Sequence, residues 1–258
     1  MNAITSSDVA CVLQPIWNKK IETSRRVRWR IEKVFGVAII NGQRQRDPRE
    51  EIIQQRNPAA WKDNLGHLLA THSTKAKRIP KHHSALDYGK VPAFIQELRK
   101  REGFSALALM FCILTATRTT ETLAATWDEI DLSKKLWRIP ADRMKAGRDH
   151  VVPLNSQAMD ILIALPKLVI NTCFFPGRGK NPLSNMIMAM QLCRMGRDDI
   201  TVHGFRSSFR DWIAEETEYP NEVAEAALAP AIESKTERAY RRGDLLERRK
   251  ALMQKWGA

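Results

Sequence analysis

A basic stretch without apolar periodicity, residues 72–84, divides this sequence into two parts. Besides two adjacent histidines and a proline, it contains the cations Lys75, Lys77, Arg78 and Lys81. Such a segment offers no face that a core would bury, so it is predicted to be an interdomain linker. At 258 residues the chain is long enough for a smaller and a larger domain. The expected division is residues 1–75, a basic linker over 76–90, and residues 91–258.

The first part is predicted to be a small helical module. Ser6 or Ser7 caps a helix that runs to about Trp17. A second helix is expected to begin at Thr23 or Ser24, with an apolar face formed by Val27, Ile31, Val34 and Phe35. Its other face is basic and carries Arg25, Arg26, Arg28, Arg30 and Lys33. A short third helix is expected from Trp61 to Leu69.

The second part is predicted to be mainly helical with one β insertion. Pro92 suits a helix start, and further helices are expected over residues 155–165, 182–194, 204–217, 221–229 and 234–250. Between them, Leu136–Ile139 alternates in polarity, Ala146–Arg148 suits a turn, and His150–Val152 returns as a second strand. The expected fold class is therefore mainly α with a small β-hairpin or sheet.

The net charge of +13 predicts an anionic partner, either nucleic acid or an acidic membrane surface. The most apolar stretch, Phe104 to Ala116, is too short to span a bilayer, and the N-terminus lacks the pattern of a signal peptide. Nucleic acid is therefore favoured, in the cytoplasm. No metal site is expected, because the four cysteines form no CxxC pair and His82 and His83 have no further ligand at a suitable spacing.

Two positions in the middle of the chain suit phosphate chemistry. Arg118 opens a helix, with Glu121 three residues later. Either the two form a local ion pair only, or Glu121 holds the Arg118 guanidinium in place for bidentate binding of a phosphate. Lys145 lies at the tip of the predicted hairpin. A lysine there is either solvated or reaches into a groove and protonates a departing oxygen.

Three more positions follow towards the C-terminus. His203 and Arg206 stand on one face of a predicted helix, where the histidine is either a core or cap residue or a phosphate ligand and proton carrier. Tyr240 lies in a basic segment with Arg238, Arg241 and Arg242. A phenol, with a pKa of roughly 10, attacks a phosphate only if the phosphate charge is neutralised. This neutralisation would come, without a metal, from Arg118, Lys145, His203 and Arg206.

The order Arg, Lys, His-x-x-Arg, Tyr at these separations resembles the tyrosine recombinases, specifically phage-type integrases of genomic islands. The resemblance runs from about residue 10 to the C-terminus and is dense over residues 115–130, 139–154, 175–185, 201–215 and 224–246. It implies a C-shaped clamp on duplex DNA. The clamp would consist of a partial helical core-binding domain, residues 1–75, and a catalytic domain, residues 91–258.

The resemblance also implies a role for each candidate residue. Tyr240 would attack the scissile phosphate and form a 3′-phosphotyrosyl link with a free 5′-hydroxyl. Arg118 and Arg206 would brace the non-bridging oxygens, and Glu121 matches the acidic residue that supports the first arginine. Lys145 would be the general acid, and His203 would assist proton transfer.

The implied assembly is a tetramer that exchanges strands at double-stranded attachment sites through a Holliday junction, without a nucleotide or metal cofactor. Its expected location is the cytoplasm, associated with the nucleoid. The sequence leaves an accessory DNA-bending protein open. DNA contacts are expected from two residues of the basic helix and three of the linker, Arg26, Arg30, Lys75, Lys77 and Arg78.

Two features depart from the family pattern. Relatives of this kind carry a histidine or tryptophan ten residues before the nucleophile, where this chain has Pro230. Proline has no side-chain donor and no backbone N–H, so one contact to the transition state is expected to be absent. The chain is also expected to begin inside the core-binding domain, without the arm-site-binding domain that precedes it in such integrases.

Two other functions fit parts of the same pattern. One is a catalytically inactive DNA-binding remnant of an integrase, which keeps the fold and the basic surface. The other is a type IB topoisomerase, which shares the chemistry but not the close motif context. A covalent protein–DNA adduct separates the recombinase from the remnant, and relaxation of supercoiled DNA without a specific site would indicate the topoisomerase.

Overall fold

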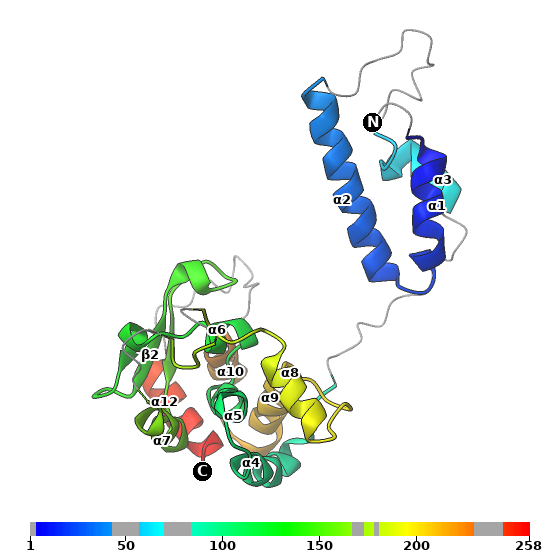
Figure 1. The fold of residues 1–258 in the computed structure, drawn as a ribbon. Helices are drawn as coiled ribbons and strands as arrows, with labels where there is room; N and C mark the ends of the chain where they lie inside the picture. Colours follow the sequence, from blue (N-terminus) through cyan, green and yellow to red (C-terminus); the bar gives the residue numbers. More distant parts are fainter. Residues whose placement is uncertain (1–3, 43–56, 70–83, 167–172, 178–180, 230–244) are drawn as a thin grey trace. The chain divides into compact units, whose positions relative to one another are not determined.

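The computed structural model describes residues 4–42, 57–69, 84–166, 173–177, 181–229 and 245–258 (Figure 1). The chain falls into two compact units, Met1–Lys81 and His82–Ala258. Some of the residues singled out in the sequence lie outside the described residues, namely Lys75, Lys77, Arg78, Pro230 and Tyr240. What was expected of these residues therefore stays a prediction.

The first unit is built on two helices, α1 (Ser6–Trp17) and α2 (Ile21–Ile40). Thr5, rather than a serine, caps α1: its hydroxyl accepts the Asp8 N–H, and the Asp8 carboxylate accepts the Thr5 N–H in return. The apolar face of α2 packs on α1 through Val27, Ile31 and Phe35. Val34, which was expected on that face, is exposed.

The third predicted helix, Trp61–Leu69, is only partly helical. Helix α3 covers Gly66–Leu69, whereas the preceding turn, η1 (Trp61–Leu65), contains non-helical backbone angles, with φ of 55° at Asp63. Side-chain contacts hold this turn: the Trp61 ring stacks on Trp17 at 5.4 Å between centroids, and the Arg28 guanidinium lies 5.7 Å from the Trp61 centroid. The expectation of a full helix was wrong because these contacts outweigh the local apolar spacing.

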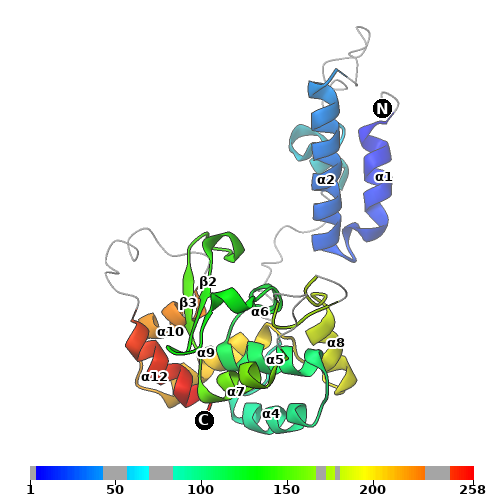
Figure 2. The same cartoon turned by 60° about the vertical axis from the view of Figure 1, so that its left-hand side comes forward.

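The second unit packs its helices around α5 (Phe104–Thr115), which Figure 2 shows in their midst. Leu109 and Phe111 of α5 are fully buried, as expected for a helix that is apolar on all sides. The surrounding helices are α4 (Val91–Arg99), α6 (Thr119–Leu123), α7 (Ser156–Ala164), α8 (Ile187–Arg194), α9 (Gly204–Glu216), α10 (Asn221–Leu228) and α12 (Leu246–Trp256). Short 3₁₀ turns are η2 (Tyr88–Lys90), η3 (Trp127–Glu129) and η4 (Ala141–Arg143).

Most of these helices agree with the sequence patterns. Those expected over residues 155–165, 204–217 and 221–229 are α7, α9 and α10. The helix expected over 182–194 begins only at Ile187, because Pro182 pairs with Pro176 in an isolated antiparallel bridge. Within the described part of the chain, no helix has the length and apolar character needed to cross a lipid bilayer.

A three-stranded antiparallel sheet confirms the predicted hairpin. Strands β2 (Leu136–Ile139) and β3 (His150–Pro153) pair with Leu136 opposite Pro153 and Ile139 opposite His150. Trp137 and Ile139 are fully buried, and Arg138 between them is exposed. A third strand, β1 (Ile130–Asp131), extends the sheet at the β2 edge. It was not expected, since two residues are too few to show an alternation.

Residues 84–90, assigned to the linker from the sequence, pack against α9 and the residues before it. The Ser84 carbonyl accepts the Thr201 N–H at 3.0 Å, Ser208 donates to the Leu86 carbonyl, and the Tyr88 hydroxyl donates to Glu215 at 2.9 Å. Gly204 makes this approach possible, because a Cβ there would lie 2.1 Å from the Ser84 oxygen. The start of α9 is thereby fixed.

Up to residue 244, the helix expected over residues 234–250 lies outside the described residues. Leu245 has φ of 49° in the left-handed region, so α12 begins only at Leu246, and it runs on to Trp256. Leu252 and Met253 are buried in a cluster with residues of α9 and α10, and Trp256 Nε1 donates to the Ile113 carbonyl at 2.9 Å. These three apolar side chains thus pack within their own chain.

Candidate active site

Arg118 lies in the short connection between α5 and α6. Ala116, with φ of 51°, ends α5, and Arg118 is the residue that precedes α6. The carboxylate of Glu121, which is only 2% exposed, accepts the Arg118 backbone N–H at 2.8 Å and its Nη1 at 2.6 Å. The ion pair suggested by the sequence is therefore present, and one carboxylate fixes both the backbone and the guanidinium of Arg118.

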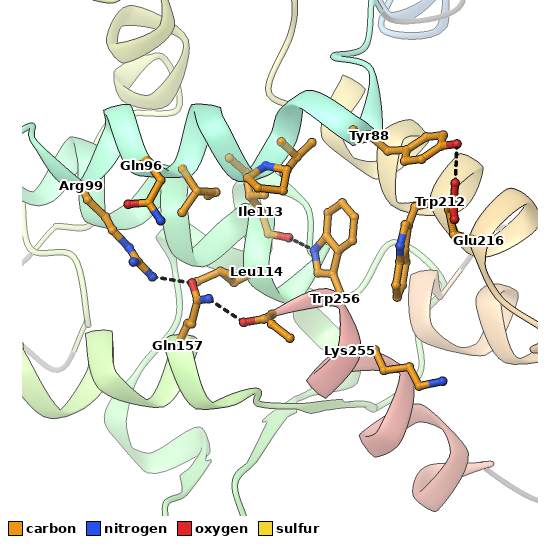
Figure 3. Close-up of a pocket in the computed structure, with 16 residues that line it drawn as sticks. Tyr88, Gln96, Arg99, Ile113, Leu114, Gln157, Trp212, Glu216, Lys255 and Trp256 are labelled. Atoms are coloured by element: carbon orange, nitrogen blue, oxygen red, sulfur yellow. Dashed lines mark hydrogen bonds between the residues drawn. The ribbon is translucent and has the colours of Figure 1, made fainter.

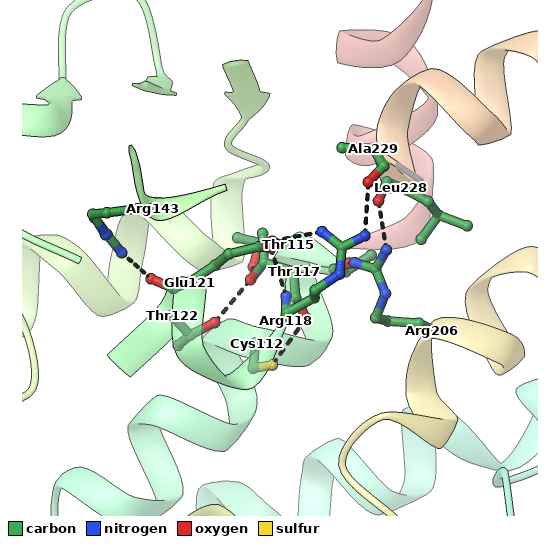
Figure 4. Close-up of polar contacts among 11 residues, drawn as sticks. Cys112, Thr115, Thr117, Arg118, Glu121, Thr122, Arg143, Arg206, Leu228 and Ala229 are labelled. Atoms are coloured by element: carbon green, nitrogen blue, oxygen red, sulfur yellow. Dashed lines mark hydrogen bonds and ion pairs between the residues drawn. The ribbon is translucent and has the colours of Figure 1, made fainter. Parts of the chain in front are cut away.

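A series of buried hydroxyl groups supports this connection (Figure 4). Thr117 Oγ1 lies 2.9 Å from Thr115 Oγ1 and 2.8 Å from Thr122 Oγ1. Thr115 in turn donates to the Phe111 carbonyl at 2.7 Å. Because these groups are buried and mutually bonded, they hold the turn that carries Arg118 in one geometry.

Arg206 reaches the same place from the first turn of α9. Its Nη1 donates to the Ala116 carbonyl and its Nη2 to the Leu228 carbonyl. Burial, and then the nearby charge of Arg118, lower the pKa of Arg206 to about 10. The guanidinium therefore remains charged at neutral pH.

The two arginines meet at the C-terminal end of α10, as Figure 4 shows. Arg118 Nη2 donates to the Ala229 carbonyl at 2.7 Å, next to the Leu228 carbonyl that accepts from Arg206. The last carbonyls of a helix lack intrahelical donors and form the negative end of its dipole, so they attract cations. Each guanidinium retains further N–H groups, and the pair is suited to binding one anion.

The other two described candidates, Lys145 and His203, are exposed. Lys145 lies between η4 and β3, and among the described residues it has no hydrogen bond or ion pair with either arginine. His203 precedes α9, one turn before Arg206. The structure thus brings together Arg118, Arg206 and Glu121.

The hairpin that carries Lys145 is tied to the arginine site by Arg143, which the sequence analysis did not single out. Its guanidinium donates to the backbone carbonyl of Glu121 and pairs with the Glu129 carboxylate. Glu129 also accepts Trp137 Nε1 at 2.8 Å. These contacts join residues far apart in the sequence, so local spacing carried no sign of them.

His150 is a second residue that sequence reasoning missed, since it served only to mark the return strand. It is the first residue of β3, and it is 9% exposed. Burial is the main reason why its pKa is lowered to about 4, and the charge of Arg249 adds to the effect. The imidazole is therefore neutral at physiological pH.

The expected DNA-binding residues of the first unit lie on α2. Arg26 and Arg30 are exposed, and Arg26 forms an exposed ion pair with Glu22 at 3.2 Å. Arg28, expected on the same face, instead points inward and donates to Glu32 and to the Ala59 carbonyl at 2.8 Å each. Among the described residues, no group of three or more His, Cys, Asp or Glu side chains is placed to hold a metal ion.

A separate cavity of about 330 Å³ lies among α4, α9 and α12 (Figure 3). Its walls include Ile95, Trp212 and Trp256, and its rim carries Arg99 and Glu216. Of the candidate catalytic residues that the structure describes, none lines it. The arginine site is therefore the better candidate for phosphate chemistry.

Comparisons with known proteins agree with this geometry. Residues 85–244 match the model of the phage integrase family, and residues 1–55 match that of the phage integrase central domain. Prophage integrase IntZ of Escherichia coli (strain K12) is 32% identical over 255 residues, which cover 97% of this chain and 58% of the relative. Prophage integrase IntA of the same organism is 42% identical over 151 residues, which cover 57% of this chain and 36% of the relative. This chain thus spans about half the length of these relatives, or less.

Solved structures have the same fold. A lambda integrase dimer bound to a COC' core site has a TM-score of 0.58 at 18% identity, covering 95% of this chain and 81% of that one. A lambda integrase tetramer bound to a Holliday junction also has a TM-score of 0.58 at 18% identity, with coverages of 92% and 66%. Since the family model matches more than half of its residues, the chain belongs to the phage integrase family of tyrosine recombinases.

Proposed function

We propose that this chain is a site-specific DNA recombinase that cleaves and rejoins duplex DNA through a 3′-phosphotyrosine. The observation that carries the proposal is the convergence of Arg118 and Arg206 at the end of α10. The sequence continues from that point to Tyr240. Two fixed guanidinium groups are suited to the non-bridging oxygens of one phosphodiester, and they stabilise the charge that develops in the transition state.

In the proposed step, the Tyr240 phenolic oxygen forms a bond to the scissile phosphorus while the bond to the 5′ oxygen breaks. Lys145 gives a proton to the departing oxygen, and His203 assists the transfer of the phenol proton. The exposure of both side chains accords with groups that meet DNA only when it binds. Rejoining is the reverse reaction with a new 5′-hydroxyl as nucleophile.

The proposed partner is double-stranded DNA at an attachment site, bound by a tetramer of this chain. The lambda integrase structures named above are complexes with a core site and a Holliday junction, which supports this assembly. Arg26 and Arg30 of α2 would contact phosphates, as would Lys75, Lys77 and Arg78. We place the activity in the cytoplasm at the nucleoid, with an accessory DNA-bending protein as a further partner.

The first test concerns the nucleophile. The substrate is a nicked duplex bearing the attachment site, which is found by recovering genomic fragments that become covalently bound to the protein. Tyr240→Phe should bind this DNA with unchanged affinity and form no covalent adduct, because phenylalanine has no attacking oxygen. The readout is a shift in mass on a denaturing gel. An adduct that persists in Tyr240→Phe would refute the proposal.

The inactive remnant is the second candidate, and Pro230 favours it, because proline offers no donor to the phosphate. Removing one preorganised donor in other enzymes lowers the rate by on the order of 10²–10³. Pro230→His should therefore raise the single-turnover cleavage rate by up to about that factor, with little change in DNA affinity. Equal rates would show that Pro230 does not limit cleavage, and intact binding without cleavage in both proteins would support the remnant.

A further inference from the structure

Glu121 supports two elements at once. Its carboxylate accepts the Arg118 backbone N–H at 2.8 Å and Arg118 Nη1 at 2.6 Å, and its backbone carbonyl accepts Arg143 Nη2 at 2.5 Å. Arg118 directly precedes α6, whereas Arg143 ends η4, two residues before Lys145. Figure 4 shows the Arg143 guanidinium directed at Glu121. One residue of α6 is thus a common support of the arginine site and of the segment that carries Lys145.

We propose that Arg143 is a positioning residue for the general-acid step, which holds the segment that carries Lys145 against α6 and so in register with Arg118. The inference rests on the proposed recombinase function, in which Lys145 protonates the departing 5′ oxygen. It assigns a part in that step to a residue outside the ordered Arg, Lys, His, Arg, Tyr set. Arg143 acts through Lys145 and needs no contact with the phosphate.

The surroundings of Arg143 fix its guanidinium on both sides. The side chain is mostly buried and pairs with the buried carboxylate of Glu129, which also accepts Trp137 Nε1 at 2.8 Å. Trp137 is fully buried in β2. A guanidinium presents several N–H groups in a rigid plane, so Arg143 bonds Glu129 through Nη1 and the Glu121 carbonyl through Nη2. The segment is thereby joined to the sheet and to α6.

The residues after Arg143 carry this support to Lys145. Met144 is buried in the main core of the second unit, and Lys145 directly after it is exposed. The Met144 N–H donates to the Ala141 carbonyl at 3.1 Å, and the Met144 carbonyl accepts the Gly147 N–H at 2.9 Å. Lys145 therefore lies within a closed turn that is anchored directly before it.

Replacing Arg143 by lysine tests the link to α6. Arg143→Lys keeps a positive charge beside Glu129 but offers a single ammonium in place of the planar fork, so the bond to the Glu121 carbonyl is lost. General acids contribute on the order of 10²–10⁴ to a rate, and a displacement of about 1 Å in a positioned group costs on the order of a hundredfold. We therefore expect Arg143→Lys to cleave the nicked substrate about 10- to 100-fold more slowly at saturating DNA.

Arg138→Lys is the matched control, because it makes the same substitution at an exposed position of β2 in the same sheet. It should cleave at a rate near that of the native chain. A rate loss in Arg138→Lys as large as in Arg143→Lys would overturn the proposal, and so would a native rate in Arg143→Lys.

The decisive measurement changes the departing atom. In a substrate with sulfur in place of the scissile 5′ oxygen, the Tyr240 oxygen bonds to phosphorus, the P–S bond breaks and the 5′ end leaves as a thiolate. A thiol has a pKa of roughly 8.5, so its anion leaves without the proton that a departing alkoxide requires. The ratio of native to Arg143→Lys rates should therefore fall severalfold, towards one, as should the ratio for Lys145→Ala.

Damage to the fold or to Arg118 would slow both reactions alike. A recovery of Lys145→Ala on the sulfur substrate without recovery of Arg143→Lys would therefore overturn the proposal. A defect of Lys145→Ala that persists with sulfur would refute the general-acid role of Lys145, and the role of Arg143 with it.

The combined variant is an independent check. If Arg143 acts through Lys145, then Arg143→Lys should add no further loss to Lys145→Ala on the oxygen substrate. Losses that multiply would mean that Arg143 acts by another route, and would overturn the proposal.

A second replacement covers the case in which Arg143→Lys fails to fold. Arg143→Met combined with Glu129→Gln removes both charges of the buried pair, and the new amide oxygen can still accept Trp137 Nε1. No buried charge is left without a partner. This double variant should show the same loss with oxygen and the same recovery with sulfur. A native rate on the oxygen substrate would overturn the proposal.

A last readout needs no cleavage, so it tests the inference even if the proposed function fails. Exchange of the Met144 and Gly147 N–H groups with heavy water is followed by NMR in the DNA-free chain. Exchange should be severalfold faster in Arg143→Lys and native in Arg138→Lys, because the turn loses its link to α6 only in the former. Native exchange in Arg143→Lys would overturn the proposal. Absence of any adduct with the native chain would count against the recombinase alone.

Discussion

At the scale of single residues, burial sets the charges of the site. It lowers the pKa of Arg206 to about 10 and that of His150 to about 4, so at neutral pH the arginine is charged and the imidazole is neutral. A neutral imidazole at position 150 therefore adds no further positive charge near Arg206 and Arg249.

This difference predicts a pH dependence of stability. The unfolded histidine titrates near pH 6.5 and the folded one near pH 4, so between these values the unfolded chain binds the extra proton. Above about pH 6.5, the contribution of His150 to the free energy of unfolding should be constant. It should fall by up to about 3 kcal/mol as the pH decreases to about 4. Urea unfolding at a series of pH values measures this free energy.

The control for this measurement is His150→Gln, which cannot titrate. Carboxylates titrate in both proteins, so the difference between the two curves isolates the histidine. That difference should grow below about pH 6.5. Parallel curves would show that His150 has no such pKa in the folded chain.

Sequence reasoning at this scale succeeded where contacts are local. The Arg118–Glu121 pair follows from a spacing of three residues at a helix start, and the ion pair is present. Arg143 instead depends on Glu121 and Glu129, 22 and 14 residues earlier in the chain. These contacts leave no local pattern. The positions of Tyr240 and Pro230 stay predictions.

At the scale of elements, helix bodies were predictable and their ends were not. The period-two pattern of Leu136–Ile139 gave the hairpin, and apolar periodicity gave α7, α9 and α10. The start of α12 after Leu245 depends on packing elsewhere, because leucine does not favour a positive φ. Aspartate tolerates one, but the turn at Asp63 is held by the contacts of Trp61 with Trp17 and Arg28. The helix predicted over residues 234–250 also ends too early, because α12 continues through the turn that contains Trp256.

The packing of α12 predicts a large effect of its tryptophan. Trp256 lies against Phe209 and Trp212, at 5.2 Å between centroids in each case, and donates to the Ile113 carbonyl. Trp256→Ala should lower the free energy of unfolding of the second unit by about 2–4 kcal/mol, through the lost packing and the lost hydrogen bond.

Ile163→Ala is the matched control, because this α7 side chain is 71% exposed, and it should change stability by less than about 0.5 kcal/mol. Urea unfolding followed by far-UV circular dichroism measures both variants. Similar values for the two would show that the Trp256 contacts add little to the fold.

At the scale of the whole molecule, charge is expected to govern the proposed encounter with DNA. The net charge of +13 is carried by a chain with two compact units, and the exposed face of α2 contributes Arg26 and Arg30. The exposed pair between Arg26 and Glu22 contributes little and exchanges readily with a phosphate. The basic stretch after residue 71 predicts a division of the chain there, whereas nothing in the sequence pattern predicts the packing of residues 84–90 on the second unit.

Affinity should therefore depend steeply on salt. The logarithm of the binding constant falls by about 0.9 per neutralised phosphate for each unit of log salt. The double variant of Arg26→Ala and Arg30→Ala should reduce that slope by up to about 1.8, measured by fluorescence anisotropy across a salt series. Arg99→Ala with Lys100→Ala removes the same charge from the end of α4 and serves as the control. A slope that falls equally in both variants would mean that total charge, and not α2, sets the binding.

Gly204 has a consequence for genetics. A side chain at this position would collide with the Ser84 carbonyl and displace the start of α9, together with His203 and Arg206. A selection for alleles that no longer recombine should therefore recover Gly204 as often as residues that touch DNA, although glycine has no functional group to offer. Such an allele would have the phenotype of an active-site mutant, and second-site suppressors at Ser84 or Ala85 would identify it as a steric one.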